Sequence, residues 1–137
     1  MASDSTTDTV TALRILVADD YPDGREMLAF FLERQGHIVA TAADGTDALA
    51  VAAAFDPEVA ILDIGMPGAS GHAVARELRK QRGDAVTLVA LSGLGEAADK
   101  ARAAEAGFNH HFTKPVDIAA LSKFLADVRK GATVANR

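Results

Sequence analysis

The sequence predicts an α/β fold, in which a parallel β-sheet of five strands is covered by helices on both faces. Two features of the chain support this expectation. Short, continuous apolar runs recur along the sequence, which is typical of strands that are buried on both faces. Between them lie longer segments in which apolar residues recur at helical spacing. Strict alternation of strands and helices predicts a parallel sheet joined by right-handed crossovers.

The first part of the chain predicts a strand, a helix and a second strand. The run from Ile15 to Ala18 is the first strand, and Pro22 opens the helix, because a missing N–H costs little in a first turn. This helix is expected to end at Gly36, where the chain can take up a left-handed conformation. Its predicted apolar face consists of Met27, Leu28, Phe31 and Leu32. His37 to Thr41 reads as the second strand.

The middle of the chain repeats the cycle. Asp44 is expected to cap a helix that runs through Leu49 and Ala53. The pair Asp56-Pro57 then makes a turn, and Val59 to Leu62 is the third strand.

The remaining elements follow the same pattern. Ser70 caps a helix that carries Val74 and Leu78 and breaks at Gly83. The predicted elements after it are a strand from Val86 to Leu91, an alanine-rich helix from about Glu96 to Ala106, a fifth strand ending at Phe112, and a last helix whose inward face holds Ile118, Leu121, Leu125 and Val128.

The composition of the chain excludes several classes of protein. The 137 residues include 49% hydrophobic and 24% charged residues, enough for one domain with its own core. We expect this domain to span residues 13–130, between a Ser/Thr-rich disordered tail, 1–12, and a short C-terminal tail, 131–137. A net charge of −5 argues against nucleic-acid binding, and the absence of cysteine excludes disulfides and thiolate metal sites. With no signal peptide or membrane-spanning run, we expect a soluble, cytoplasmic protein that binds other proteins.

Polar side chains stand at the predicted strand ends. They are Asp19, Asp20, Asp63, Ser92 and Lys114. In a parallel sheet, ligands bind beyond the carboxyl ends of the strands, so these residues can converge although they are far apart in sequence. Three carboxylates held together repel one another unless a proton or a cation neutralises them. Mg²⁺, which prefers oxygen ligands, is the expected cation.

This pattern resembles the receiver domain of two-component response regulators, from about Leu13 to Lys130. The matching features occur in order: the acid pair, Asp63, Met66-Pro67, Gly71, Leu91-Ser92-Gly93, Ala106-Gly107 and Lys114-Pro115. The resemblance implies a flavodoxin-like (βα)5 sheet with strand order 2-1-3-4-5. It also implies that Asp63 accepts a phosphoryl group from a phosphohistidine on a histidine kinase or histidine phosphotransfer protein.

The resemblance assigns roles to the strand-end residues. It implies that Asp20 and Asp63 ligate Mg²⁺ directly, that Asp19 acts through water, and that Gly65 contributes its backbone carbonyl. Lys114 would bond one phosphoryl oxygen and Ser92 another, with the Ser92 hydroxyl turning inward as a switch. Taken alone, Asp19 or Asp20 could be a helix cap, Lys114 a surface lysine and Ser92 a turn residue. Only their combination favours a site.

Four histidines require separate interpretation. His111 occupies the position where receivers usually carry a Tyr or Phe that moves inward on activation, so we predict that His111 moves toward the space vacated by Ser92. His110 and His111 are neighbours on a strand and point to opposite faces, so they do not chelate one ion. His37 and His72 are expected at the surface or at helix ends.

Two enzyme-like readings are less favourable. An Asp-nucleophile phosphatase of the dehalogenase type needs an acid two residues after the nucleophile, and that position is Gly65. A nucleotide or flavin binder needs a Gly-rich phosphate loop after the first strand, where this chain has Asp19-Asp20-Tyr21-Pro22. We therefore expect a phosphoacceptor switch that promotes its own phosphorylation and dephosphorylation rather than an enzyme.

Receivers occur alone or as modules of larger proteins. The stretch 107–117 resembles the receivers of hybrid histidine kinases, but a chain from Met1 to Arg137 favours a stand-alone receiver. An excised hybrid-kinase module and a phosphate shuttle or sink are the alternatives. We expect a downstream protein partner, and a monomer or a phosphorylation-dependent dimer. Gly65 and Leu94, which flank the expected path of hydrolytic water, predict a long-lived phosphoryl group.

Overall fold

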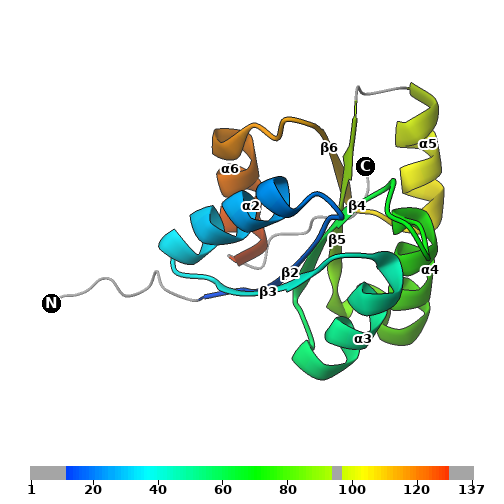
Figure 1. The fold of residues 1–137 in the computed structure, drawn as a ribbon, viewed down its shortest axis with the longest axis horizontal. Coiled ribbons are helices and arrows are strands. Elements are labelled where there is room, and N and C mark those ends of the chain that lie inside the picture. Colours follow the sequence, from blue (N-terminus) through cyan, green and yellow to red (C-terminus); the bar gives the residue numbers. More distant parts are fainter. Residues whose placement is uncertain (1–11, 94–96, 130–137) are drawn as a thin grey trace, which may run out of the picture.

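The computed structural model describes residues 12–93 and 97–129 (Figure 1). Its single sheet has five parallel strands, which are, from edge to edge, β3 (Ile38–Ala42), β2 (Arg14–Ala18), β4 (Val59–Asp63), β5 (Thr87–Ser92) and β6 (His110–Thr113). In order of the strands along the chain this is 2-1-3-4-5. The predicted fold class and strand order are therefore confirmed.

The helices form a layer on each side of the sheet (Figure 1). On one side lie α2 (Pro22–Arg34) and α6 (Ile118–Arg129), and on the other lie α3 (Gly45–Phe55), α4 (Gly71–Arg82) and α5 (Ala97–Ala106). Successive strand residues point to opposite faces, so each strand contributes to two cores. Ile15 and Val17 pack under α2 and α6, whereas Leu16 and Ala18 pack under α3 and α4. This double burial explains why the strands read as continuous apolar runs.

Element boundaries differ from the predicted ones by a residue or two. The strand β4 extends to Asp63 because this residue pairs with Leu91, and β5 extends to Ser92 because this residue pairs with Thr113. The hydrogen-bond ladder, rather than the end of the apolar run, sets where a strand stops. A short 3-10 turn, η1 (Gly83–Ala85), follows α4 and was not predicted.

Three side chains lie elsewhere than expected. Met27 is 69% exposed, since α2 turns Leu28 and Leu32 to the sheet and leaves Met27 at the edge of the contact. His37 and His72 were expected at the surface or at helix ends, and both are buried rather than at the surface. His37 accepts a hydrogen bond from the Leu13 N–H at its Nδ1 (3.2 Å). His72 does lie in the first turn of α4, but its ring meets the edge of Phe108.

Arg79 connects the C-terminal ends of α4 and α5. From α4, its guanidinium donates hydrogen bonds to the carbonyl oxygens of Val86 (2.8 Å) and Gly107 (2.6 Å), and to Asn109 Oδ1 (2.8 Å). It also bonds the Gly83 carbonyl. The C-terminal ends of α4 and α5 are thereby fastened to the starts of β5 and β6, at the amino edge of the sheet.

The tails predicted for residues 1–12 and 131–137 lie outside the described residues, apart from residue 12. Within the described ranges the longest helix, α2, has 13 residues. No helix there has the length that is needed to cross a bilayer.

Candidate functional site

The carboxyl edge of the sheet gathers the residues that the sequence singled out. Asp63 is the last residue of β4 and Ser92 the last of β5, while Asp19 and Lys114 directly follow β2 and β6. Because β2, β4 and β5 are adjacent and in register, these strand ends lie side by side. The topology therefore brings together side chains that are up to about 95 residues apart in sequence.

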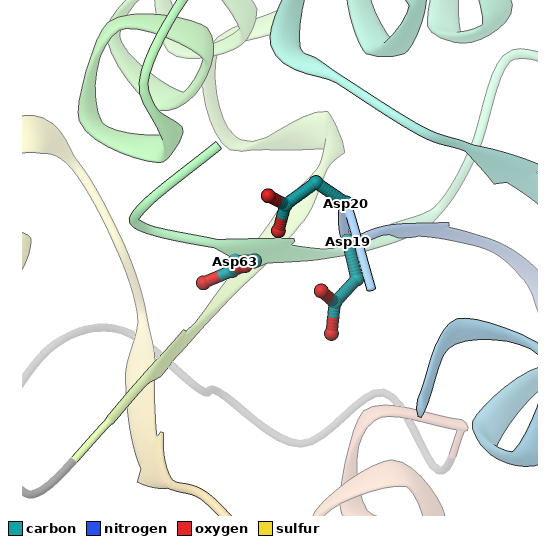
Figure 2. A group of neighbouring side chains, drawn as sticks. All are labelled: Asp19, Asp20 and Asp63. Carbon is teal, nitrogen blue, oxygen red and sulfur yellow. The ribbon is translucent and has the colours of Figure 1, made fainter. Parts of the chain in front are cut away.

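Three carboxylates face one another at this edge. Asp19, Asp20 and Asp63 each offer an oxygen, and these oxygens lie within 4.8 Å of one another. Figure 2 shows the side chains reaching out from the ends of two neighbouring strands. Asp19 and Asp63 are buried and Asp20 is exposed. Hard oxygen donors at this spacing, open on one side to solvent, fit a small divalent cation that retains water ligands.

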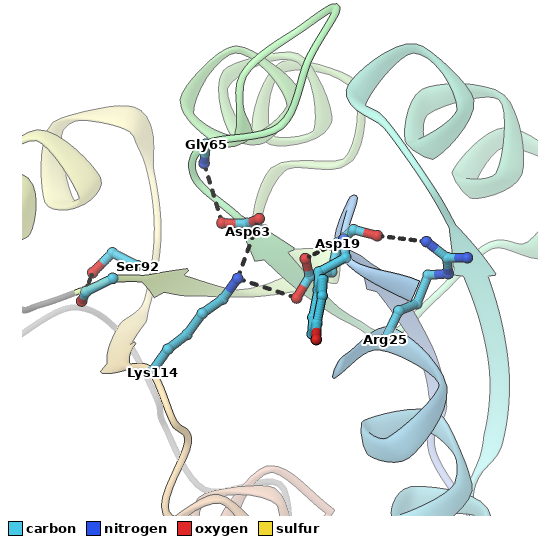
Figure 3. A network of polar contacts seen from close by, with 8 residues as sticks. Asp19, Arg25, Asp63, Gly65, Ser92 and Lys114 are labelled. Atoms are coloured by element: carbon cyan, nitrogen blue, oxygen red, sulfur yellow. Dashed lines mark hydrogen bonds and ion pairs between the residues drawn. The ribbon is translucent and has the colours of Figure 1, made fainter. Parts of the chain in front are cut away.

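Lys114 bridges two of the acids. Its Nζ lies 3.2 Å from Asp19 Oδ2 and 3.3 Å from Asp63 Oδ2 (Figure 3). Burial alone would lower the pKa of Lys114, but attraction to Asp63 and Asp19 outweighs it and raises this pKa. The lysine therefore stays charged and holds the two buried carboxylates together.

Asp63 is a carboxylate under opposing influences. Burial raises its pKa above the ordinary value and the charge of Asp19 adds to this, whereas the N–H of Gly65 and the ammonium of Lys114 act in the opposite direction. The Gly65 N–H donates to Asp63 Oδ1 at 3.2 Å. The net effect is a raised pKa. The folded chain thus disfavours the charged form of Asp63 relative to water.

The backbone around Asp19 is fixed by contacts that the sequence did not predict. The Tyr21 N–H donates to Asp19 Oδ1 (3.0 Å), and the guanidinium of Arg25 donates to the Asp19 carbonyl oxygen (2.8 Å). Arg25 is one turn into the helix that follows the acid pair. That position, a basic residue near the start of a helix next to clustered acids, is the signal that could have identified it.

Gly71 brings α4 close to the phosphoacceptor candidate. A Cβ at this position would lie 2.5 Å from the backbone oxygen of Asp63. The Gly71 N–H donates to the Ile64 carbonyl oxygen (3.0 Å). The first turn of α4 therefore rests directly on the peptide that follows the end of β4.

Ser92 does not contact the acids in this structure. Its Oγ lies 2.7 Å from His111 Nε2 and 3.3 Å from the Gly93 carbonyl oxygen. In Figure 3 the Ser92 hydroxyl points away from Asp63. Leu94, which was expected to flank the path of hydrolytic water, lies outside the described residues.

His110 and His111 lie on opposite sides of β6. The His110 ring stacks on Phe124 of α6 at a centroid distance of 4.8 Å, and burial lowers its pKa. The His111 ring instead meets Ser92. The two rings thus have separate surroundings.

An apolar cavity of about 480 Å³ opens beside the acids. It lies between the start of α2 and the segment that joins β6 to α6. Asp19 and Lys114 form its polar end, and apolar residues, including Tyr21, Met27 and Val116, form its walls. Exposed Met27 therefore borders a cavity rather than the sheet core.

Comparison with known proteins places this site in a family. The family model described as the response regulator receiver domain matches residues 15–126. This chain is a member of the response regulator receiver family. Receivers are signalling switches rather than conventional enzymes.

Relatives of this receiver occur in proteins of different organisation. Protein PilH of Pseudomonas aeruginosa is 34% identical over 119 residues, which cover 86% of this chain and 98% of PilH. The sensor histidine kinase RcsC of Salmonella typhi is 34% identical over 124 residues, which cover 90% of this chain but 13% of RcsC. A co-crystal structure from Saccharomyces cerevisiae pairs the histidine phosphotransfer protein Ypd1 with the receiver domain of Ssk1. It matches with a TM-score of 0.78 and 26% identity, covering 85% of this chain and 88% of the matched one.

Proposed function

We propose that Asp63 accepts a phosphoryl group from a phosphohistidine, carried by a histidine kinase or a histidine phosphotransfer protein, in a Mg²⁺-dependent reaction. The observation that carries this proposal is the shared ammonium of Lys114, which lies 3.3 Å from Asp63 Oδ2 and 3.2 Å from Asp19 Oδ2. The buried carboxylate can act as a nucleophile, and the ammonium beside it can donate a hydrogen bond to a phosphoryl oxygen.

In the proposed transfer, one carboxylate oxygen of Asp63 attacks the phosphorus atom. The new O–P bond forms as the P–N bond to the donor imidazole breaks, and the imidazole leaves with the bonding electron pair. The protein supplies mainly alignment and neutralisation of charge on the phosphoryl oxygens. Lys114 Nζ donates to one of these oxygens, and the Ser92 hydroxyl turns to donate to another. In this way the chain promotes its own phosphorylation and dephosphorylation.

The carboxylates supply the reason for a metal. One ammonium among three carboxylates leaves the group negative, so a phosphoryl donor would be repelled. The donor set fits Mg²⁺, with Asp20 and Asp63 as direct ligands, Asp19 acting through water, and Gly65 contributing its backbone carbonyl. When bound, Mg²⁺ neutralises part of the charge on the phosphoryl oxygens.

The cavity beside the acids suits the donor protein. Its apolar walls end at Asp19 and Lys114, so a helix that carries the phosphohistidine can bury apolar side chains there while its phosphoryl group reaches Asp63. Met27 is 69% exposed at the mouth of this cavity and is available for such a contact. A donor charged from ATP works in the cytoplasm, and we propose the same location for this chain.

Three arrangements of the pathway are candidates. Similarity over nearly the whole of PilH supports a stand-alone receiver with a protein output. Similarity to RcsC supports the alternative, a receiver module of a hybrid histidine kinase, and a shuttle or sink in a phosphorelay fits the same chemistry. A sink would lower the phosphorylation of a second receiver that shares the donor, which a competition assay measures.

The test of the proposed function uses the small donor acetyl phosphate and intact-mass measurement. We expect one phosphoryl group to be added in the presence of Mg²⁺ and none in EDTA. Asp63→Asn should remain unlabelled, whereas Asp127→Asn, which alters an exposed acid on α6, should be labelled like the wild type. Mg²⁺-dependent labelling of Asp63→Asn would refute the assignment. Size-exclusion chromatography of the same samples distinguishes a monomer from a phosphorylation-dependent dimer.

A further inference from the structure

His111 reaches Ser92 because of the way β5 and β6 pair. In the parallel register, Ala90 lies opposite His111, and Ser92 lies two residues further along β5 on the same face. Neighbouring His110 faces α6, so His111 must project to the other side. The small Ala90 side chain leaves room for the imidazole to lean along the strand toward Ser92. The contact therefore follows from the pairing of the two strands.

The contact between them is a well-formed hydrogen bond. Ser92 Oγ and His111 Nε2 are 2.7 Å apart, a short distance for a hydroxyl and a ring nitrogen. The other contact of the hydroxyl, to the Gly93 carbonyl oxygen, is longer, at 3.3 Å. Ser92 is only 3% exposed, so water competes little for this hydroxyl. His111 therefore determines where the hydroxyl points, and that direction is away from Asp63 (Figure 3).

We propose that His111 is a positioning residue, which holds the Ser92 hydroxyl away from Asp63 in the unphosphorylated protein. The inference rests on the proposed function, because it concerns the hydroxyl that is to bond the phosphoryl group. To donate to a phosphoryl oxygen, Ser92 must first leave His111. A charge-assisted bond to a phosphoryl oxygen is stronger than an ordinary bond to a ring nitrogen, so the exchange is favourable, but the bond that is lost reduces the gain.

The consequence is a receiver that resists activation. A hydrogen bond present only in the unphosphorylated conformation stabilises that conformation and raises the ligand concentration needed to shift the equilibrium. Phenylalanine, one of the residues that receivers usually carry at this position, fills similar space but has no atom that can bond Ser92. The histidine thus sets a threshold that a Phe would not.

The test is a titration with beryllofluoride, a phosphoryl mimic, in saturating Mg²⁺, followed by NMR. The affinity of His111→Phe should exceed that of the wild type by about three- to tenfold, the range expected for loss of one ordinary hydrogen bond. His111→Gln, whose amide can reach the hydroxyl, should stay close to the wild type. In a Ser92→Ala background, His111→Phe should have no effect on affinity, because the hydroxyl is absent.

The outcomes separate this role from the proposed function. Equal affinity of His111→Phe and wild type, or an equal gain with and without the Ser92 hydroxyl, would overturn the positioning role alone. A wild-type chain that takes up neither beryllofluoride nor a phosphoryl group from acetyl phosphate would overturn the function and this inference together. A second measurement tests the hydrogen bond itself. The Nε2 resonance of His111 should differ between the wild-type protein and Ser92→Ala, and equal resonances would show that the two side chains are not bonded.

Discussion

Gly71 lies so close to Asp63 that a side chain would not fit between them, because a Cβ would come within 2.5 Å of the Asp63 carbonyl oxygen. The start of α4 and the end of β4 are thus too close together for any side chain at position 71. This contact fixes the position of the Asp63 backbone, and Asp63 is the residue that bears the proposed chemistry.

We predict that Gly71→Ala destabilises the fold by about 1 to 3 kcal/mol, the usual effect of overpacking. It should also slow labelling by acetyl phosphate, since Asp63 must shift. Gly24→Ala is the matched control, because Gly24 lies in the first turns of α2, where an added Cβ meets only side-chain atoms, the Tyr21 ring at 3.3 Å and Asp19 Oδ2 at 3.8 Å, and no backbone. That variant should be neutral or stabilised by roughly 0.4 to 1 kcal/mol. Urea unfolding measures both, and equal effects would show that Gly71 has no special role.

Asp63 should make the fold pH-dependent when Mg²⁺ is removed. Its pKa is raised in the folded chain, chiefly by burial, so the folded state binds this proton more tightly than the unfolded state. Ionised Asp63 then opposes folding. This destabilisation is absent below the ordinary pKa of Asp and is complete above the raised pKa of Asp63. Asp63→Asn should therefore increase the free energy of unfolding at neutral pH in EDTA, with a gain that fades in acid. Asp127→Asn is the control, and a loss of stability in Asp63→Asn would contradict this prediction.

Lys114→Met should slow phosphorylation by on the order of 10²- to 10³-fold, the usual effect of deleting a donor to a developing charge. It should also destabilise the Mg²⁺-free protein, since two buried carboxylates lose their shared cation. The pKa of Lys114 is raised, so its contribution to stability is present below the ordinary Lys pKa and is lost as pH rises through the raised value. Lys123→Met, on the exposed side of α6, should change neither quantity. Labelling rates and urea unfolding measure the two effects.

Arg25→Ala should weaken Mg²⁺ binding by about tenfold or more, because the guanidinium orients the Asp19 peptide from behind the carboxylates. The chain has one tyrosine, Tyr21, and no tryptophan. The backbone N–H of Tyr21 donates a hydrogen bond to Asp19 Oδ1. Tyrosine fluorescence should therefore report Mg²⁺ directly. Arg34→Ala, at the other end of α2, is the matched control. Identical Mg²⁺ affinities in the two variants would exclude an orienting role for Arg25.

Met27→Glu should impair phosphotransfer from a protein donor while leaving labelling by acetyl phosphate intact, since only a protein uses the apolar cavity. The control is Ala53→Glu, which places the same charge on an exposed position of α3, across the sheet. If both donors were slowed alike, the cavity would be part of the chemistry and not of docking.

Much of this architecture was predictable from local patterns. Apolar runs that are buried on both faces identify parallel strands, and the alternation with helices fixes where the carboxyl edge lies. Asp19, Asp63 and Lys114 could therefore be grouped before any coordinates were known. The resemblance to receivers supplied the strand order, which alternation alone left open.

Other features depend on contacts between distant segments, which periodicity does not encode. Met27 was expected in the apolar face of α2, but the cavity shared with Val116 leaves it exposed. His37 is buried because the Leu13 N–H needs an acceptor, a condition that arises only when the two segments meet. The bond between Ser92 and His111 depends on strand register and rotamer together.

We expect the network of Arg79 to restrain one end of α5 more than the other. It ties the C-terminal ends of α4 and α5 to the amino edge of the sheet, whereas Ser92 lies at the opposite edge, near the start of α5. A change at Ser92 should therefore displace the N-terminal end of α5, while the C-terminal end stays held at Gly107 by Arg79. Displacement should be greatest around Ala97 and smallest at Ala106. Amide hydrogen exchange with and without beryllofluoride should follow that gradient in the wild type, and Arg79→Met should flatten it by releasing the C-terminal end of α5.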